Sequence, residues 1–211
     1  MTRCVAKCCA MTSALSDSPV AAAIEEALQL LDRARTFVKE AETIGLDAFP
    51  TPAINEFRNV AYHLAAYVRS PDDLENINSA LRHTKKAYLD ANEAYAFALL
   101  YAVSRYDRAF RGFREVVSAH LPHYLEQQRA LLHLRQQLSN HKMNSEEERF
   151  DRALALEGDF VTIRALLDDL ETARGAIEDA IHKQKVSAWQ WLIGILIAII
   201  SATVGWGLSL L

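Results

Sequence analysis

Cysteine is almost absent from this sequence: its 211 residues contain three, and Cys4, Cys8 and Cys9 all fall in the first ten positions. Cysteines so close to one end of the chain cannot form disulfides that hold distant segments together. Three thiolates without a fourth ligand also make a poor zinc site. The first ten residues also lack the apolar core of a secretory signal. We therefore expect residues 1–17 to be a flexible, reduced N-terminus, and we expect no metal and no cofactor in the chain.

Stretches that alternate apolar and polar residues, as β-strands do, are missing throughout. A P-loop, a nucleophile elbow and paired acidic metal motifs are missing as well. Hydrophobic residues make up 51% of the chain and charged residues 24%, which is enough for a packed core. The net charge of −4 gives no general reason to expect a nucleic-acid partner. The sequence therefore predicts an all-α protein, an elongated multi-helix bundle with long coiled-coil-like helices.

Charge is absent from Val186 to the C-terminus, where residues 189–211 read WQWLIGILIAIISATVGWGLSLL. One helix of this length can cross a bilayer core of about 30 Å with its backbone groups satisfied. Indole rings favour headgroup depth, and lysines before the span favour a cytoplasmic position for the preceding chain. The residues expected at the membrane interface are Lys183, Lys185, Trp189, Trp191 and Trp206.

We therefore expect residues 187–211 to be a single-pass C-terminal transmembrane helix in the inner (cytoplasmic) membrane, with residues 18–186 forming a cytoplasmic helical bundle and stalk. The alternative is a buried core helix, which rarely needs such a length without charge. Small residues recur at intervals of four along the span, and this spacing lets transmembrane backbones approach and associate. The residues expected to mediate oligomerisation are Gly194, Ala198, Ala202, Ser201 and Gly205.

Helical periodicity and capping signals divide the preceding chain into segments. Ser70-Pro71-Asp72-Asp73 and Ser145-Glu146-Glu147-Glu148 are strong helix starts, and Gly45 is a stop. The helices are expected to run from Pro19 to about Gly45, from Pro52 to Arg69, from Ser70 without a break to Pro122, from Pro122 to about Asn140, and from Ser145 onward.

The third of these helices is expected to be a rod roughly 70 Å long. Its inward positions step by three and four residues, which indicates a seam that packs along other helices for its whole length. No proline separates the last helix from Trp189, so the stalk is expected to run into the membrane as one stiff helix. One extra residue shifts the phase of the inward pattern near its end. The expected inward positions are Leu74, Ile77, Leu81, Thr84, Tyr88, Ala91, Tyr95, Ala98 and Ala102, and after the shift Tyr106, Ala109, Phe113 and Val116.

In Arg58-Asn59-Val60-Ala61-Tyr62-His63 an arginine and a polar residue are followed, after the spacers, by a histidine. A cation can steady phosphate charge while an imidazole moves a proton near neutral pH. Together with Leu81–Tyr88 on the next helix, this motif resembles the HEPN superfamily of small helical RNases, over roughly residues 52–95. The resemblance implies metal-independent RNA cleavage by Arg58 and His63 across a dimer interface. It also implies a place among the accessory or effector proteins, some with membrane segments, of prokaryotic antiviral systems.

Spacing and helical geometry leave other interpretations open. An arginine followed at similar distance by a histidine recurs at Arg114/His120 and at Arg135/His141. Five residues at 100° each place Arg58 and His63 about 140° apart on one helix, with His63 pointing away from the apolar face and Arg58 flanking it. A degenerate HEPN-like bundle without catalysis and an unrelated helical bundle are the alternatives to an active RNase.

Four arginines step along the long helix three residues apart: Arg105, Arg108, Arg111 and Arg114. They are candidates for contact with phosphate or nucleic acid, so RNA is one expected partner. Steps of three residues spiral by about 60° each, so the four span half of the helix circumference and do not form one stripe. The alternative is a set of solvated arginines that pair with carboxylates on neighbouring helices.

Among the function classes, these features favour an oligomeric, membrane-anchored helical effector or accessory protein that changes membrane permeability. Its expected partners are the lipid bilayer and further copies of the chain. A membrane-tethered HEPN-like RNase and a structural tether for a cytoplasmic protein partner are the alternatives, and of the three only the RNase is an enzyme.

Overall fold

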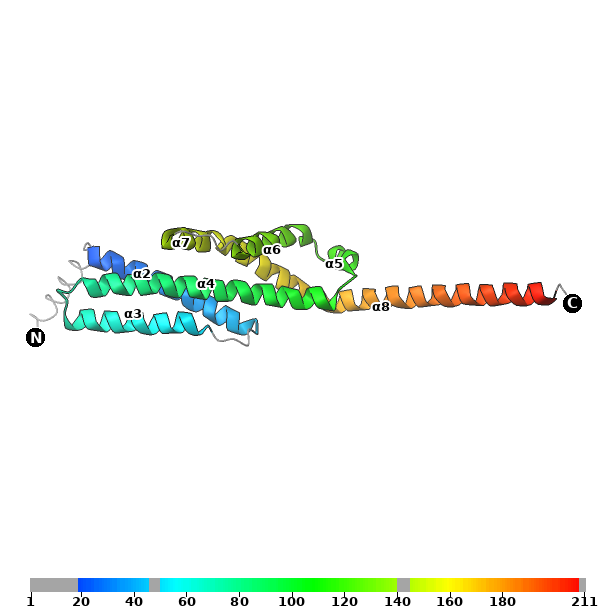
Figure 1. The fold of residues 1–211 in the computed structure, drawn as a ribbon, viewed down its shortest axis with the longest axis horizontal. Coiled ribbons are helices and arrows are strands. Elements are labelled where there is room, and N and C mark those ends of the chain that lie inside the picture. The colour runs from blue at the N-terminus through cyan, green and yellow to red at the C-terminus, as the bar shows by residue number, and fades with distance from the viewer. Residues whose placement is uncertain (1–18, 46–49, 140–144, 209–211) are drawn as a thin grey trace, which may run out of the picture.

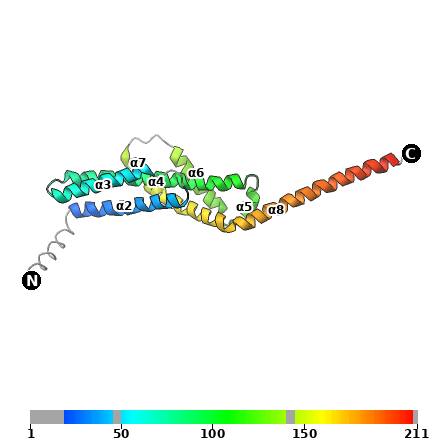
Figure 2. The ribbon, with the colours of Figure 1, turned by 90° about the horizontal axis from the view of Figure 1, so that it is seen from below.

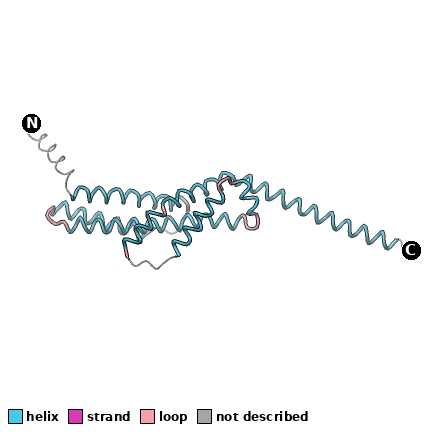
Figure 3. Tube along the Cα trace, turned by 90° about the horizontal axis from the view of Figure 1, so that it is seen from above, coloured by secondary structure: helices cyan, strands magenta, loops and turns pink. Residues whose placement is uncertain are grey.

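The structure, a computed structural model, describes residues 19–45, 50–139 and 145–208, with side chains described up to residue 199. Every regular element in these ranges is an α-helix, which confirms the all-α prediction (Figure 3). The expected flexible segment 1–17, with its three cysteines, lies outside the described residues. The helices are α2 (Pro19–Thr43), α3 (Thr51–Arg69), α4 (Glu75–Ala109), α5 (Arg114–His120), α6 (Tyr124–Ser139), α7 (Glu146–Ala155) and α8 (Glu157–Leu208).

Helix α4 packs against both α2 and α3, which scarcely touch each other (Figures 1 and 2). The inward side of α2 is a ridge of small and aliphatic residues at helical spacing. The predicted stop at Gly45 is confirmed: its φ is +87°, and its N–H donates to the Glu42 carbonyl at 3.1 Å. A residue without a Cβ adopts this left-handed conformation without strain, so the helix ends there. The buried ridge of α2 consists of Ala27, Leu30, Ala34, Val38 and Ala41.

The seam predicted for α4 is confirmed in its middle part, where the predicted positions from Thr84 to Ala102 are buried. It is wrong at both ends, where Leu74 and Ala109 are exposed. Phe37 of α2 stacks on Tyr95 of α4, with ring centroids 5.4 Å apart. Phe160 of α8 meets both rings edge-on, at centroid distances of 5.6 and 5.2 Å. Aromatic pairs in these arrangements add to the energy of area burial. This aromatic cluster joins α2, α4 and α8.

The rod predicted from Ser70 starts later in the structure. Ser70 closes α3, and its backbone N–H donates to the carbonyls of Ala66 and Tyr67. Helix α4 begins at Glu75, whose N–H donates to Asp73 Oδ1 at 3.2 Å. The residue at the N-cap position is Leu74, which makes no side-chain capping bond, so the predicted serine cap is wrong and Asp73 accepts the first N–H from one position further back.

The prediction of an unbroken rod to Pro122 is wrong, since α4 stops at Ala109. Gly112 then turns the chain with a φ of +87°, a conformation that glycine adopts readily. The turn brings Phe110 and the residues of α5 back into the largest core cluster. A straight continuation would have left these apolar side chains in water, so burial decides against the rod.

Helix α7 begins as predicted, because Ser145 Oγ accepts the N–H of Glu148 at 3.1 Å. The expected single helix from Ser145 onward is nevertheless interrupted at Leu156, which separates α7 from α8. Asn92, buried on α4, donates from Nδ2 to the Ala153 carbonyl at 3.1 Å. The Asn92 amide thus gives a hydrogen-bond donor to a backbone carbonyl near the end of α7, where the regular hydrogen bonds of the helix stop.

Helix α8 belongs to the bundle only in its first half. Its last buried residue is Ile181, and every described side chain from residue 182 to residue 199 is exposed. The second half runs alone, away from the other helices (Figures 1 and 2). The prediction that one unbroken helix continues from the stalk past Trp189 is confirmed.

No helix among the residues searched, which are those that the structure describes, combines the length and the apolarity needed to cross a membrane. Residues 200–211, the second part of the expected anchor, lie outside the residues whose side chains are described.

Candidate functional site

The predicted catalytic histidine lies between α3 and the first half of α4. His63 is partly buried, and its Nδ1 is 3.3 Å from Asn76 Oδ1. Its ring stacks on the ring of His83, with centroids 5.2 Å apart and planes at 15°. Nδ1 of His83 lies 2.5 Å from Glu56 Oε2. Two imidazoles from different helices are thus held together, each with an oxygen partner; below they are called the histidine pair.

Arg58 does not belong to the histidine pair. It is exposed on α3, whereas His63 packs against α4. The prediction that His63 points away from the apolar face and Arg58 flanks it is therefore wrong. Their separation of about 140° around the helix keeps them from meeting on one phosphate within a single chain. A phosphate could be held by both only if a second copy supplied one of them.

One imidazole of the histidine pair, His83 on α4, has a carboxylate partner, Glu56, on α3. Glu56 orients His83 through Nδ1, which leaves Nε2 as its other donor or acceptor. Such a carboxylate–imidazole pair is a common way to position a general acid or base. Among the described residues, no group of three or more His, Cys, Asp or Glu side chains is arranged to hold a metal ion.

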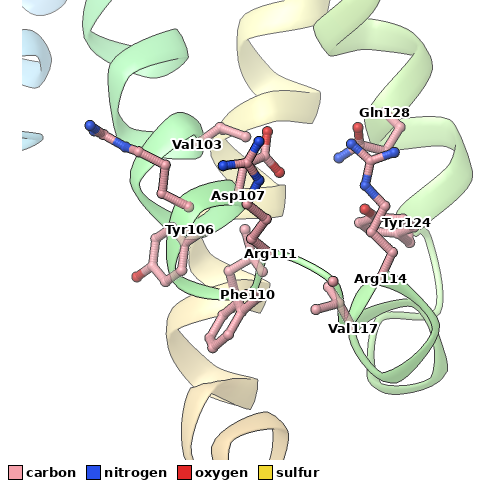
Figure 4. A pocket seen from close by; sticks show the side chains of 12 residues that line it. Val103, Tyr106, Asp107, Phe110, Arg111, Arg114, Val117, Tyr124 and Gln128 are labelled. Carbon is pink, nitrogen blue, oxygen red and sulfur yellow. The ribbon is translucent and has the colours of Figure 1, made fainter. Parts of the chain in front are cut away.

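Three of the four predicted phosphate-contacting arginines line one pocket, at the corner where α4 ends and α5 begins. This corner pocket has a volume of about 350 Å³ and contains Arg108, Arg111 and Arg114. Figure 4 shows Arg111 and Asp107 on one side of it and Arg114 and Gln128 on the other. Pockets for small ligands commonly begin at about 300 Å³. The pocket wall is completed by Tyr106, Tyr124 and Gln128 and by the apolar residues Val103, Phe110, Val117 and Leu170.

Asp107 is the one carboxylate that lines the corner pocket among the described residues. Arg135 Nη2 lies 3.8 Å from Asp107 Oδ2, so part of its charge is already compensated. Burial raises the pKa of the Tyr124 hydroxyl, Asp107 raises it further, and Arg114 opposes the shift. Tyr124 is therefore a neutral hydrogen-bond donor at physiological pH. The pocket carries an excess of positive charge with two polar groups beside it.

Arg105 does not share the corner pocket. It lines a second pocket of about 460 Å³, between α2, α4 and α8, which shares Tyr106 and Phe110 with the corner pocket. There Arg105, Arg164 and Arg174 stand beside Asp168, Glu171 and Glu178. The three guanidinium groups and the three carboxylates balance in charge. The ion pairs among them, Arg164–Asp168 and Arg174–Glu178, both lie within α8, so pairing of Arg105 with an acid on a neighbouring helix stays a prediction. The predicted set of four arginines is therefore split by the structure into three and one.

Residues predicted for the membrane interface lie on the free part of α8. The exposed fractions are 67% for Trp189 and 73% for Trp191. Lys183 and Lys185 are exposed as well, and Lys185 Nζ lies 5.2 Å from the centre of the Phe113 ring. Of the residues predicted for oligomerisation, Gly194 and Ala198 are described and exposed. The side chains of Ser201, Ala202, Gly205 and Trp206 lie outside the described part of the chain.

Several residues of these sites were missed from the sequence. Glu56 and His83 come from different helices, and periodicity does not tell which residues of two helices face each other. Tyr124 and Gln128 reach the corner pocket only because the chain turns at Gly112. That single glycine between two helical segments was the available signal.

Comparisons of the chain with protein-family models, with curated proteins and with solved structures found no match.

Proposed function

We propose that the protein is a membrane-anchored helical effector or accessory protein, whose bundle is held at the bilayer by the second half of α8. The proposal rests on one observation: the part of α8 that leaves the bundle carries large apolar side chains that are 41–73% exposed. These side chains are Trp189, Trp191, Leu192, Ile193, Ile195, Leu196, Ile197 and Ile199.

Apolar side chains around the whole circumference of one helix have no favourable place in water. Burying a Leu or Ile side chain contributes roughly 1.5–3 kcal/mol. A groove on another protein would cover one side of such a helix, whereas hydrocarbon covers every side, and the helix satisfies its own backbone groups. In the sequence the uncharged run continues to residue 211. These points support the bilayer as the environment of this segment.

The order of charged and aromatic residues supports an orientation. Lys183 and Lys185 stand six and four residues before Trp189, and no charged residue follows them in the sequence. Lysine is favoured on the cytoplasmic side of a span and tryptophan at the headgroups. The bundle is accordingly proposed to face the cytoplasm.

Self-association of the anchor is the second part of the proposal. Gly194 and Ala198 are four residues apart on α8, and a Cβ added at Gly194 would meet nothing within 4 Å in the single chain. Small residues at this spacing let two membrane helices pack closely. Oligomers of the anchor would then change membrane permeability. The resemblance of residues 52–95 to the HEPN superfamily supports a setting in prokaryotic antiviral defence.

Leucine at both Gly194 and Ala198 is expected to separate the oligomers, because the larger side chains keep backbones apart. Mass measurement of the full chain in detergent should give an oligomer for the natural sequence and a monomer for Gly194→Leu/Ala198→Leu. The double variant should also cause less leakage of dye from liposomes than the natural sequence. The matched control is Ile193→Leu/Ile197→Leu, which conserves volume and should change neither result. A monomeric natural protein that leaves liposomes tight would contradict the proposal.

RNA cleavage is a second candidate function, and the histidine pair favours it. His63→Ala and His83→Ala are each expected to lower the rate of RNA cleavage by about 10²–10⁴-fold, the usual contribution of a general acid or base. Arg58→Ala should lower it as well if a second copy completes the site. His123→Ala, an exposed histidine outside the pair, is the control. Cleavage that is unchanged in all three variants would remove this function.

A further inference from the structure

We propose that the corner pocket between α4 and α5 binds a phosphate group, as the phosphomonoester of a small ligand. Three arginines line this pocket of about 350 Å³, against one carboxylate. Phosphate oxygens accept charge-assisted hydrogen bonds, and the fork of a guanidinium matches their geometry. The proposal concerns a small phosphorylated ligand and not a nucleic-acid strand, because the pocket has the volume of a single ligand molecule.

The guanidinium groups are available for a ligand. Among the described residues, no carboxylate forms an ion pair with Arg111 or with Arg114. Arg108 is held by its own helix, since its Nε donates to the Ser104 carbonyl at 3.2 Å. Figure 4 shows Arg111 and Arg114 on opposite sides of the pocket, so a phosphate between them could accept from both.

Neutral groups complete the recognition. Tyr124 and Gln128 line the same side as Arg114 (Figure 4) and offer a hydroxyl and an amide donor. Below them the wall is apolar: Phe110 and Val117 are buried, at 7% and 5% exposure. A small pocket with an apolar floor and a few converging polar groups is the usual form of a ligand site.

The second arginine-containing pocket, between α2, α4 and α8, serves as an internal comparison. Its three guanidinium groups stand among three carboxylates, and Tyr106 donates its hydroxyl hydrogen bond there to Glu171. An anion would meet no excess of positive charge in it. An excess of positive charge is therefore found in the corner pocket and not in the second pocket, although both contain arginines of α4.

The position of the pocket indicates where the phosphate comes from. Phe113, in the turn between Arg111 and Arg114, lies against Lys185 of α8. Trp189 is four residues further along α8, or about 6 Å. Figure 1 shows the end of α4 and helix α5, which line the pocket, beside the point where α8 leaves the bundle. If the proposed membrane anchoring holds, this is the level of the lipid headgroups, and the phosphomonoester of phosphatidate is within reach; a soluble phosphate ester is the other source.

The test is calorimetric titration of the full chain in a neutral detergent. The probes are inorganic phosphate, short-chain phosphatidate and short-chain phosphatidylcholine, which lacks a phosphomonoester. Arg111→Gln/Arg114→Gln is expected to weaken binding by at least about tenfold, because each lost charge-assisted contact matters on that scale. The control Arg69→Gln/Arg105→Gln removes the same charge from exposed positions outside the pocket and should bind as the natural chain does.

Binding of phosphatidate that depends on Arg111 and Arg114, without binding of phosphate, supports the lipid source. Binding of inorganic phosphate with the same dependence supports a soluble ligand, and this result can hold even if the chain proves not to enter membranes. The proposal is overturned if neither inorganic phosphate nor phosphatidate binds. It is equally overturned if Arg69→Gln/Arg105→Gln weakens binding as much as Arg111→Gln/Arg114→Gln does. It is also overturned if phosphatidylcholine binds as tightly as phosphatidate, or if an RNA oligonucleotide binds through these arginines and neither phosphate probe competes.

Discussion

Full-length protein is expected to sediment with membranes and to stay there after an alkaline carbonate wash, whereas the Ile195→Arg/Ile199→Arg variant is expected in the supernatant. Both isoleucines are exposed on the free half of α8. An arginine at the centre of a membrane helix costs about 2.5–3.5 kcal/mol on insertion scales. Two of them should shift the partition by roughly a thousandfold or more. The measurement is the fraction of protein in pellet and supernatant after high-speed centrifugation of lysed cells.

The matched control is Val161→Arg, at a position that is 72% exposed on the bundle half of the same helix. It adds an arginine to the same helix outside the proposed anchor and should leave the protein in the pellet. Deletion of residues 187–211 should release the bundle in folded form, because the last buried residue of α8 is Ile181. Full-length protein that stays in the supernatant without detergent would show that this segment is not an anchor.

Phe160→Ala is expected to be among the most destabilising single substitutions in the bundle. Phe160 is 2% exposed and contacts the rings of Phe37 and Tyr95, so its loss opens a cavity between three helices. Truncation of a buried phenylalanine to alanine costs about 3–5 kcal/mol. At about 2–4 °C per kcal/mol for a chain of this size, Tm should fall by about 6–20 °C. Thermal unfolding followed by circular dichroism measures the change.

The next residue along α8 supplies the comparison. Val161→Ala shortens an apolar side chain that faces away from the bundle, and exposed substitutions usually stay within about 0.5 kcal/mol. Equal losses of Tm for both variants would contradict the packing of α8 on α2 and α4.

The helices could be predicted where the signal is local. Gly45 and Ser145 lie at the helix end and the helix start that their residue types indicate. The tyrosine and alanine seam of α4 follows from spacing alone, because residues three and four apart share a face. Such features depend on a few consecutive residues, so the sequence contains all that is needed.

The errors concern features that depend on more than one element. Gly112 ends the long helix because Phe110 and α5 find a core to enter, and that core is formed by residues far along the chain. Asn92 receives its partner from α7, 61 positions away in sequence. Arg108, Arg111 and Arg114 meet in one pocket only after this turn, whereas helical geometry alone spread them around a cylinder. Tertiary burial decided each of these cases.

Helix α8 is a single unbroken element of 52 residues, or about 78 Å at 1.5 Å per residue. Its first part is wedged among the aromatic rings of the bundle, and its far part stands free. Rotation or tilt of the free part therefore acts first on Ile181 and Ile177, the buried residues nearest to it, because the helix has no joint between them and the free part. Inserting two glycines after Lys183 would uncouple the two parts mechanically while leaving both of their surfaces unchanged.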